Sequence, residues 1–371
     1  MNKTFTPPYN VKLKQARSSN LELYRIVCMF MIIAHHFVVN SGLTSQGGVM
    51  ENNPTNIKTI YLWLIGMWGK TGINCFLMIT GYFMCNSDIT IKKFLKLLLE
   101  IYFYKFVIFG IFAIAGYETF TPLRIVKLFM PFWGFSSDFV GCFLMFYLTI
   151  PFWNILIKNM SKRQHKLLLI LLLGIYSICG TIPKFHISFN YITWFGVVYL
   201  VASYIRLYPN KVFDKKKLWG FLTIGLIIIS VASMLVMLRF LRGTAGQYFV
   251  ADSNKFLAIA VAVASFLWFK NLNLKYSKII NTIGASTFGV LLIHANSNAM
   301  RQWLWKDTVD CVGAYSMSLS SLIFYSLAVV VSVFVICAII DIIRIKLLET
   351  PFFNWLDRKV NLENLWQKIK L

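Results

Sequence analysis

Long apolar segments alternate with short polar segments along the whole chain. Each apolar segment has the length, about 20 residues, that an α-helix needs to cross the hydrocarbon core of a bilayer. This pattern predicts an all-α, polytopic transmembrane helical bundle with about ten spans. We expect the spans at residues 21–40, 60–84, 94–116, 139–157, 166–183, 190–208, 218–238, 256–269, 282–298 and 315–343.

The polar segments divide the chain into one membrane domain and two short tails. Residues 1–20 are predicted to form a cytoplasmic N-terminal tail, and residues 21–345 hold the membrane domain. Residues 346–371 are predicted to form a cytoplasmic C-terminal tail, whose mixture of aromatic and basic residues suits an amphipathic helix on the inner leaflet. No soluble domain is left, so any chemistry must depend on polar side chains within the spans or at their ends.

The composition agrees with a membrane protein, and the basic charge agrees with a definite orientation. Of the 371 residues, 58% are hydrophobic and only 14% are charged, which is far below the charge that a soluble surface requires. The net charge of +23 suggests nucleic acid as a partner. However, most Lys and Arg residues fall in every second polar segment, as the positive-inside rule predicts for a chain with both termini in the cytoplasm. The lipid bilayer therefore explains the charge, and we expect no nucleic-acid partner.

The seven cysteines do not indicate a metal site. They are scattered, odd in number and mostly within predicted spans, and no CxxC pair is present. We therefore expect neither a zinc site nor a disulfide framework, and no bound cofactor.

Three polar residues interrupt the first predicted span, LELYRIVCMFMIIAHHFVV. His36 follows Arg25 by eleven positions, so on a helix the two side chains are only about 20° apart around the axis and about 16 Å apart along it. His35 lies about 80° to the other side. The geometry therefore predicts that Arg25 and His36 face one cavity, whereas His35 is a packing residue or supports the site indirectly.

Both residues of this pair also have simpler explanations. Arg25 is near the cytoplasmic edge and can extend to lipid head groups, and a buried histidine can simply join two helices by a hydrogen bond. If they share a cavity, Arg25 can bind phosphate and His36 can take a proton from a hydroxyl. An enzyme that moves an acyl group from cytosolic acyl-CoA to an acceptor on the other side of the membrane needs both a phosphate-binding group and a general base.

Other polar residues of the spans, with His35, are weaker candidates, for a role in supporting the site or in binding the acceptor. His294, in the outer half of the ninth predicted span, is a structural hydrogen-bonding group or a second catalytic histidine. Lys70 either pairs with a carboxylate or lines the cavity. Glu100 and Lys105 are about 140° apart on the third span, so we expect them to face different neighbours.

Three lysines lie at the cytoplasmic end of the third span. They can anchor the helix by the positive-inside rule, or they can bind the phosphates of CoA. The residues are Lys92, Lys93 and Lys96.

Several motifs resemble the integral-membrane acyltransferases of acyltransferase family 3. In that family the first membrane helix has an arginine, ten residues and a histidine, as Arg25 and His36 do here. The segments NLELYRIVCMFMIIAHHF, GKTGINCFLMITGYF, FLMFYLTIPFWN, VVYLVASYIRLYP and STFGVLLIHANS are similar to the subgroup that O-acetylates bacterial surface polysaccharides. The resemblance covers about residues 20 to 345. Cys142, Thr80 and the three lysines depart from the usual residues of the subgroup.

The resemblance implies an enzyme of the bacterial cell membrane that transfers acetyl from acetyl-CoA to a hydroxyl of a cell-surface glycan or its lipid-linked precursor. His36 would be the catalytic base, and Arg25 would position the donor. A glycan transporter or flippase that uses the same polar residues is the alternative, because intramembrane Arg and His are compatible with both classes. A non-catalytic scaffold of a polysaccharide assembly complex is a third hypothesis.

Overall fold

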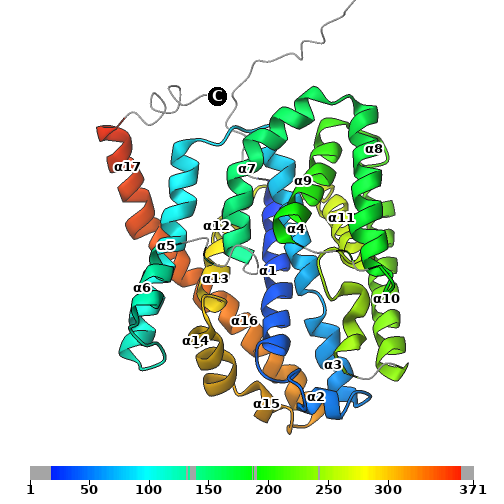
Figure 1. Ribbon diagram of the computed structural model, residues 1–371, viewed down its shortest axis with the longest axis vertical. Coiled ribbons are helices and arrows are strands. Elements are labelled where there is room, and N and C mark those ends of the chain that lie inside the picture. The colour runs from blue at the N-terminus through cyan, green and yellow to red at the C-terminus, as the bar shows by residue number, and fades with distance from the viewer. Residues whose placement is uncertain are drawn as a thin grey trace, which may run out of the picture.

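The computed structural model describes residues 18–130, 133, 139–185, 187, 190–240 and 243–360. Within this part of the chain every regular element is a helix. Figure 1 shows these helices side by side in one bundle, with α1 (Ser19–Val39) near its centre. The all-α class expected from the sequence is confirmed.

Six helices of the described chain are long and apolar enough to cross a membrane, which makes the chain a multi-pass membrane protein. They are α1, the adjoining α3 (Ile57–Gly66) and α4 (Gly69–Met84), α5 (Ile91–Ile114), α7 (Phe139–Asn159), α10 (Lys216–Phe240), and α16 (Leu319–Arg344) with its continuation to Lys359.

The remaining predicted spans correspond to shorter or interrupted helices. Residues 166–183 fall on α8 (Lys162–Leu173) and a π-helical turn (Gly174–Cys179), and two short apolar helices follow as α9 (Tyr191–Leu207) and α11 (Phe256–Lys270). Every predicted span therefore contains helix, but the number of ten crossings and the cytoplasmic location of both termini stay predictions.

The predicted loops contain short helices at the rims of the bundle. These are α2 (Val49–Asn52), α6 (Pro122–Phe129), a 3₁₀ segment (Gly243–Val250), α14 (Asn298–Arg301), a π-helical segment (Gln302–Thr308) and α15 (Cys311–Ala314). Figure 1 places α14 and α15 at the same end of the bundle as α2, which follows the C-terminal end of α1.

The ninth predicted span, residues 282–298, is broken rather than continuous. It consists of α12 (Lys278–Ala285) and α13 (Thr287–His294), and the chain then bends by 91° into the α14–α15 segment. Side chains satisfy the backbone at both breaks. The Ser286 hydroxyl donates to the carbonyl of Ile283, and the Ser297 hydroxyl accepts from the backbone N–H of Met300. Breaks of this kind are tolerated at membrane depth only where protein groups replace the lost helical bonds.

The described part of the predicted C-terminal tail continues the last long helix, and its position on the inner leaflet stays a prediction. A π-helical turn (Ile345–Glu349) joins α16 to α17 (Thr350–Lys359), so that helix runs continuously from Leu319 to Lys359. The predicted domain boundary at residues 345–346 falls inside this helix. The remainder of the C-terminal tail, residues 361–371, and residues 1–17 of the N-terminal tail lie outside the described residues.

α1 belongs to both apolar cores of the bundle. Near its start, Tyr24 and Cys28 are buried in a cluster with α4, α7, α9 and α11. Further along, Ile33 and Phe37 are buried in a cluster with α3, α13 and α16. Residues at the middle of α1 are therefore held where two groups of helices meet.

A close contact between α1 and α4 fixes the position of His35. The His35 ring donates from Nδ1 to the carbonyl of Gly66 at 2.6 Å. A Cβ atom at Gly69 would overlap the Cβ and Cγ atoms of His35. Only glycine at position 69 therefore lets the two helices approach this closely.

We expect Gly69→Ala to destabilise the protein by about 1–3 kcal/mol, because the added methyl group overpacks this contact. Gly110→Ala is the matched control, since a Cβ there meets no atom within 4 Å. Thermal unfolding in detergent, followed by size-exclusion chromatography of the tagged protein, measures the difference. Equal melting temperatures for the two variants would contradict the close contact.

Candidate active site

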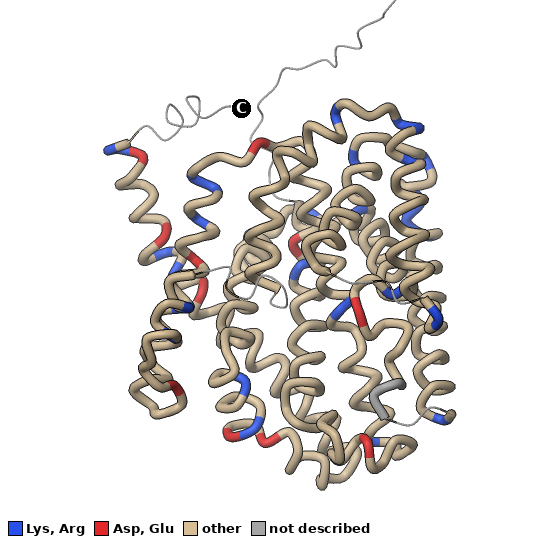
Figure 2. Tube along the Cα trace, viewed as in Figure 1, with Lys and Arg blue, Asp and Glu red and all other residues tan. Residues whose placement is uncertain are grey.

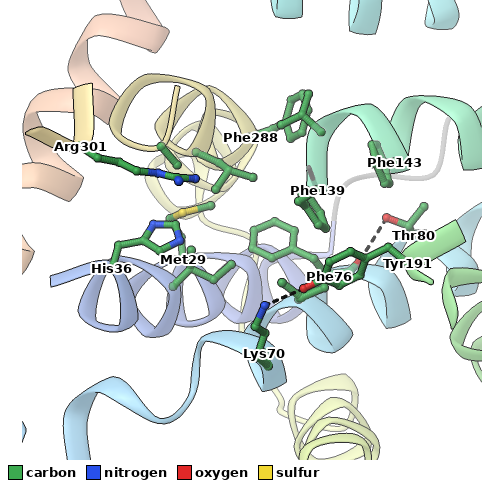
Figure 3. Close-up of a pocket in the computed structure, with 15 residues that line it drawn as sticks. Met29, His36, Lys70, Phe76, Thr80, Phe139, Phe143, Tyr191, Phe288 and Arg301 are labelled. Atoms are coloured by element: carbon green, nitrogen blue, oxygen red, sulfur yellow. Dashed lines mark hydrogen bonds between the residues drawn. The ribbon is translucent and has the colours of Figure 1, made fainter. Parts of the chain in front are cut away.

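A cavity of about 450 Å³ lies beside α1 in the middle of the bundle, and we call it the central cavity (Figure 3). Its walls come from α1, α4, α7, α9, α13 and the end of α14. The lining residues are Met29, Ile32, His36, Lys70, Ile73, Phe76, Thr80, Phe139, Val140, Phe143, Tyr191, Phe288, Leu291, Ala295 and Arg301.

One stripe of α1 faces the central cavity. Met29, Ile32 and His36 all line it, and their spacing of three and four residues places them on one helical face. Arg25 lies four residues before Met29, so it continues this stripe toward the start of α1. Arg25 does not line the cavity itself, and its guanidinium pairs with Glu22 at 3.4 Å. His35 points instead toward α3 and α4, as described above.

His36 and His294 form a direct hydrogen bond between α1 and α13. His36 Nδ1 lies 3.0 Å from His294 Nε2, and His294 Nδ1 lies 2.6 Å from the carbonyl oxygen of Val290. A carbonyl can only accept, so His294 carries its proton on Nδ1 and, as a neutral ring, accepts at Nε2. His36 then donates from Nδ1, which leaves its own Nε2 with a free lone pair. The chain of bonds therefore sets the tautomer of His36.

Two cations accompany this histidine pair in the central cavity. Figure 3 shows the Arg301 side chain directed toward His36 and the Lys70 side chain directed toward Tyr191. Lys70 Nζ donates to the Tyr191 hydroxyl at 2.7 Å. Among the described lining residues none is acidic, so the cavity favours a ligand or an intermediate that carries negative charge.

Four phenylalanine rings line the central cavity. Phe139 and Phe143 come from α7, Phe288 comes from α13 and Phe76 comes from α4. Phe143 packs against Phe288 with ring centroids 5.9 Å apart. An aromatic wall of this kind leaves few hydrogen-bonding partners for water and suits an apolar acyl or thioester group.

The three lysines at the start of α5 lie away from the central cavity. Lys92 pairs with Asp357 at 2.5 Å and Lys96 pairs with Glu349 at 2.6 Å, both through carboxylates of the C-terminal helix. Lys93 Nζ donates to the Ser87 hydroxyl. These ion pairs hold α5 against the continuation of α16, and an incoming phosphate would have to replace them.

Glu100 and Lys105 face different neighbours, as their angular separation predicts. Glu100 pairs with Arg344 at 3.0 Å, and Arg344 also binds Asp341 and Glu349 at 2.7 and 2.9 Å. Lys105 donates to the carbonyls of Lys127 and Met130 at the end of α6. Both residues therefore stabilise contacts between helices rather than line the central cavity.

Sequence reasoning did not single out Arg301 or Tyr191. Arg301 falls in a predicted outer loop, and the 91° bend after α13 brings it back toward His36. The run Asn296–Ser297–Asn298 contains the residue types that favour a helix start, and this was the available signal for a break there. Tyr191 begins α9 and shows no distinguishing pattern in the sequence.

The described residues contain no group of three or more His, Cys, Asp or Glu side chains that could hold a metal ion. The central cavity itself presents a histidine pair and the two cations Lys70 and Arg301. The fold and the site define the class of the protein. It is a multi-pass helical membrane protein with a histidine pair at an internal cavity.

The acyltransferase domain of acyltransferase family 3 matches residues 18–341, and the chain belongs to this family. The match contains every residue of the central cavity. No curated protein and no solved structure matches the chain. The family expected from the sequence motifs is confirmed, and the protein is a membrane acyltransferase. Membership of the polysaccharide-acetylating subgroup stays a prediction.

Proposed function

We propose that the protein transfers an acetyl group from cytosolic acetyl-CoA to a hydroxyl of a cell-surface glycan or its lipid-linked precursor, in the bacterial cell membrane. The observation that carries this proposal is the hydrogen-bonded chain from Val290 through His294 to His36. It leaves one unprotonated nitrogen, His36 Nε2, at a cavity without acidic residues among those described. A general base in that state is what hydroxyl acylation requires.

His36 Nε2 takes the proton of the acceptor hydroxyl as the hydroxyl oxygen attacks the thioester carbonyl. The new C–O bond forms, and negative charge develops on the carbonyl oxygen, where the positive potential of Arg301 and Lys70 lowers its free energy. The C–S bond then breaks, and the thiolate of CoA leaves with the proton that His36 received. His294 accepts from the His36 ring throughout and stabilises its protonated form.

Arg25 supplies the link to the donor in this proposal. It is on the same stripe of α1 as His36 and about 16 Å nearer the start of the helix. A guanidinium there can bind the phosphates of CoA bidentately, while the extended pantetheine arm spans the distance to His36. The positive-inside pattern places this end of α1 at the cytoplasm, where acyl-CoA is available.

Family membership favours an enzyme over the glycan transporter or flippase considered from the sequence. The histidine pair supports the same choice, because transport alone does not require an imidazole with a defined tautomer. Loss of glycan export without any change in its acetylation would reverse this preference.

We expect His36→Ala to lower acetylation by about 10²–10⁴-fold, because the general base is lost. His35→Ala is the matched control, since His35 lies next in sequence but faces α3 and α4, and we expect it to retain substantial activity per folded molecule. The acetate content of the surface polysaccharide, measured by NMR in a deletion strain that expresses each variant, gives the result. Equal losses in both variants, at equal protein levels, would show that the two histidines are not functionally distinct.

His294 is proposed as a positioning residue, so its replacement tests the hydrogen bond rather than the proton transfer itself. We expect His294→Leu to lower kcat roughly 10- to 100-fold, because the His36 N–H loses its acceptor. His294→Gln should restore part of this loss, since an amide oxygen can accept the same hydrogen bond. Release of CoA from acetyl-CoA by purified protein, with host polysaccharide as acceptor, measures kcat and the donor KM. Equal kcat values for Leu and Gln would remove the hydrogen bond from the mechanism.

Arg25→Lys tests the donor-binding role. We expect it to raise the Kd for acetyl-CoA about tenfold despite the retained charge, because a lysine cannot bind phosphate bidentately. Titration with acetyl-CoA and with dephospho-acetyl-CoA measures the effect. If the Kd does not change for either ligand, Arg25 does not contact the donor phosphates.

A further inference from the structure

A second cavity, of about 470 Å³, lies at the C-terminal end of α1, and we call it the polar cavity. One side comes from the end of α1 and the loop after it, and the other side comes from α14 and the π-helical segment that follows. Its lining residues are Val39, Asn40, Gly42, Thr44, Ser45, Asn298, Arg301, Gln302 and Lys306.

The chemistry of the polar cavity differs from that of the central cavity. Instead of aromatic rings it presents hydroxyls, carboxamides and two basic side chains. The Asn40 Nδ2 atom is buried and, among the described residues, has no hydrogen-bond partner. A buried donor without a partner is costly, and a ligand oxygen would remove that cost.

Arg301 connects the two cavities because it lines both of them. On α1, Asn40 in the polar cavity follows His36 in the central cavity by one helical turn, and its backbone N–H donates to the His36 carbonyl at 3.0 Å. A ligand that fills the polar cavity can therefore place one of its groups near His36.

The charge of the polar cavity is unbalanced. Within the described chain, neither Arg301 nor Lys306 forms an ion pair with a carboxylate. The nearby carboxylate of Asp307 instead accepts from the Gln302 amide and the Tyr117 hydroxyl, both at 2.8 Å. In Figure 2 basic and acidic positions lie together along this segment. The charge of Asp307 therefore lowers the positive potential there, but its carboxylate forms no ion pair with either cation among the described residues. The two cations remain available to an anion.

We propose that the polar cavity is the acceptor subsite and that it selects hydroxyl-bearing acceptors with an anionic group, a carboxylate or a phosphate, near the hydroxyl to be acylated. The inference rests on the proposed function. Lys306 and Arg301 attract the anion, and the carboxamides and hydroxyls bind the sugar hydroxyls. By the predicted topology this cavity opens on the side of the membrane opposite Arg25, so donor and acceptor enter from opposite ends of α1.

Three acceptor probes test the selectivity. They are an oligosaccharide with glucuronic acid residues, its carboxyl-reduced neutral counterpart, and a glycerol phosphate oligomer. Binding of each to the purified full chain, measured by calorimetry at low and high salt, does not depend on turnover. We expect at least one anionic probe to bind about tenfold more tightly than the neutral one, with the difference reduced at high salt. The tighter of the two anionic probes identifies carboxylate or phosphate as the preferred group.

Lys306→Gln tests the residue assignment, because Lys306 lines the polar cavity and not the central cavity. We expect it to reduce the preference for the anionic probe roughly threefold to fivefold without changing acetyl-CoA affinity. Arg239→Gln is the matched control, since Arg239 lies in the last turn of α10 and lines neither cavity. It removes one positive charge elsewhere and should leave the preference unchanged.

Two outcomes overturn the inference. Equal binding of all three probes would show that the polar cavity does not select anions. If acetyl were still transferred to any of these probes, the proposed function would stand even though this inference fails. Equal effects of Lys306→Gln and Arg239→Gln would show that only the overall charge matters. A failure of the proposed function would give a different result. The acceptor would bind, but acetyl-CoA would keep its acetyl group.

Discussion

The hydrogen bond between His36 and His294 is the interaction on which the rest of the site depends. In a membrane interior a polar ring nitrogen has no water to bind, so each nitrogen needs a protein partner or an open cavity. Here the Val290 carbonyl fixes the tautomer of His294, and His294 in turn fixes the tautomer of His36. The remaining nitrogen, Nε2 of His36, is left for the central cavity that His36 lines. The backbone of α13 thereby determines the protonation pattern of a side chain on α1. It also fixes the two helices against each other at the level of the central cavity.

The fold was largely predictable from the sequence because apolar segment length and helical periodicity are local properties. Every predicted span contains helix, and the angular argument correctly separated His35 from the stripe of Met29, Ile32 and His36. The same argument placed Arg25 on that stripe. It could not show that Arg25 pairs with Glu22 and lies outside the cavity lining, because that depends on where the neighbouring helices end.

The parts that were missed depend on interruptions of the helical pattern. Periodicity holds only within one continuous helix, so it cannot place Arg301 relative to His294 across a 91° bend. In the sequence alone, the lysines of α5 look like unpaired anchoring charges. Their partners Asp357 and Glu349 lie far along the chain, on the C-terminal helix, and only the structure shows the ion pairs. Intramembrane polar residues thus fall into two groups. Glu100, Lys105 and Arg344 bind other protein groups away from the central cavity, whereas Arg301 lines it. Only the three-dimensional arrangement separates these groups.

The continuous helix from Leu319 to Lys359 has a mechanical consequence. Its 41 residues give a rod about 60 Å long, roughly twice the thickness of the hydrocarbon core of about 30 Å. Such a rod must tilt strongly or project from the bilayer. Among the described residues, its far end contacts α5 through two partly exposed ion pairs and through the buried Phe353 ring. Exposed pairs weaken as salt concentration rises. A rise in salt concentration is therefore expected to weaken the attachment of this end to α5, while the buried Arg344 stays bound by its three carboxylates.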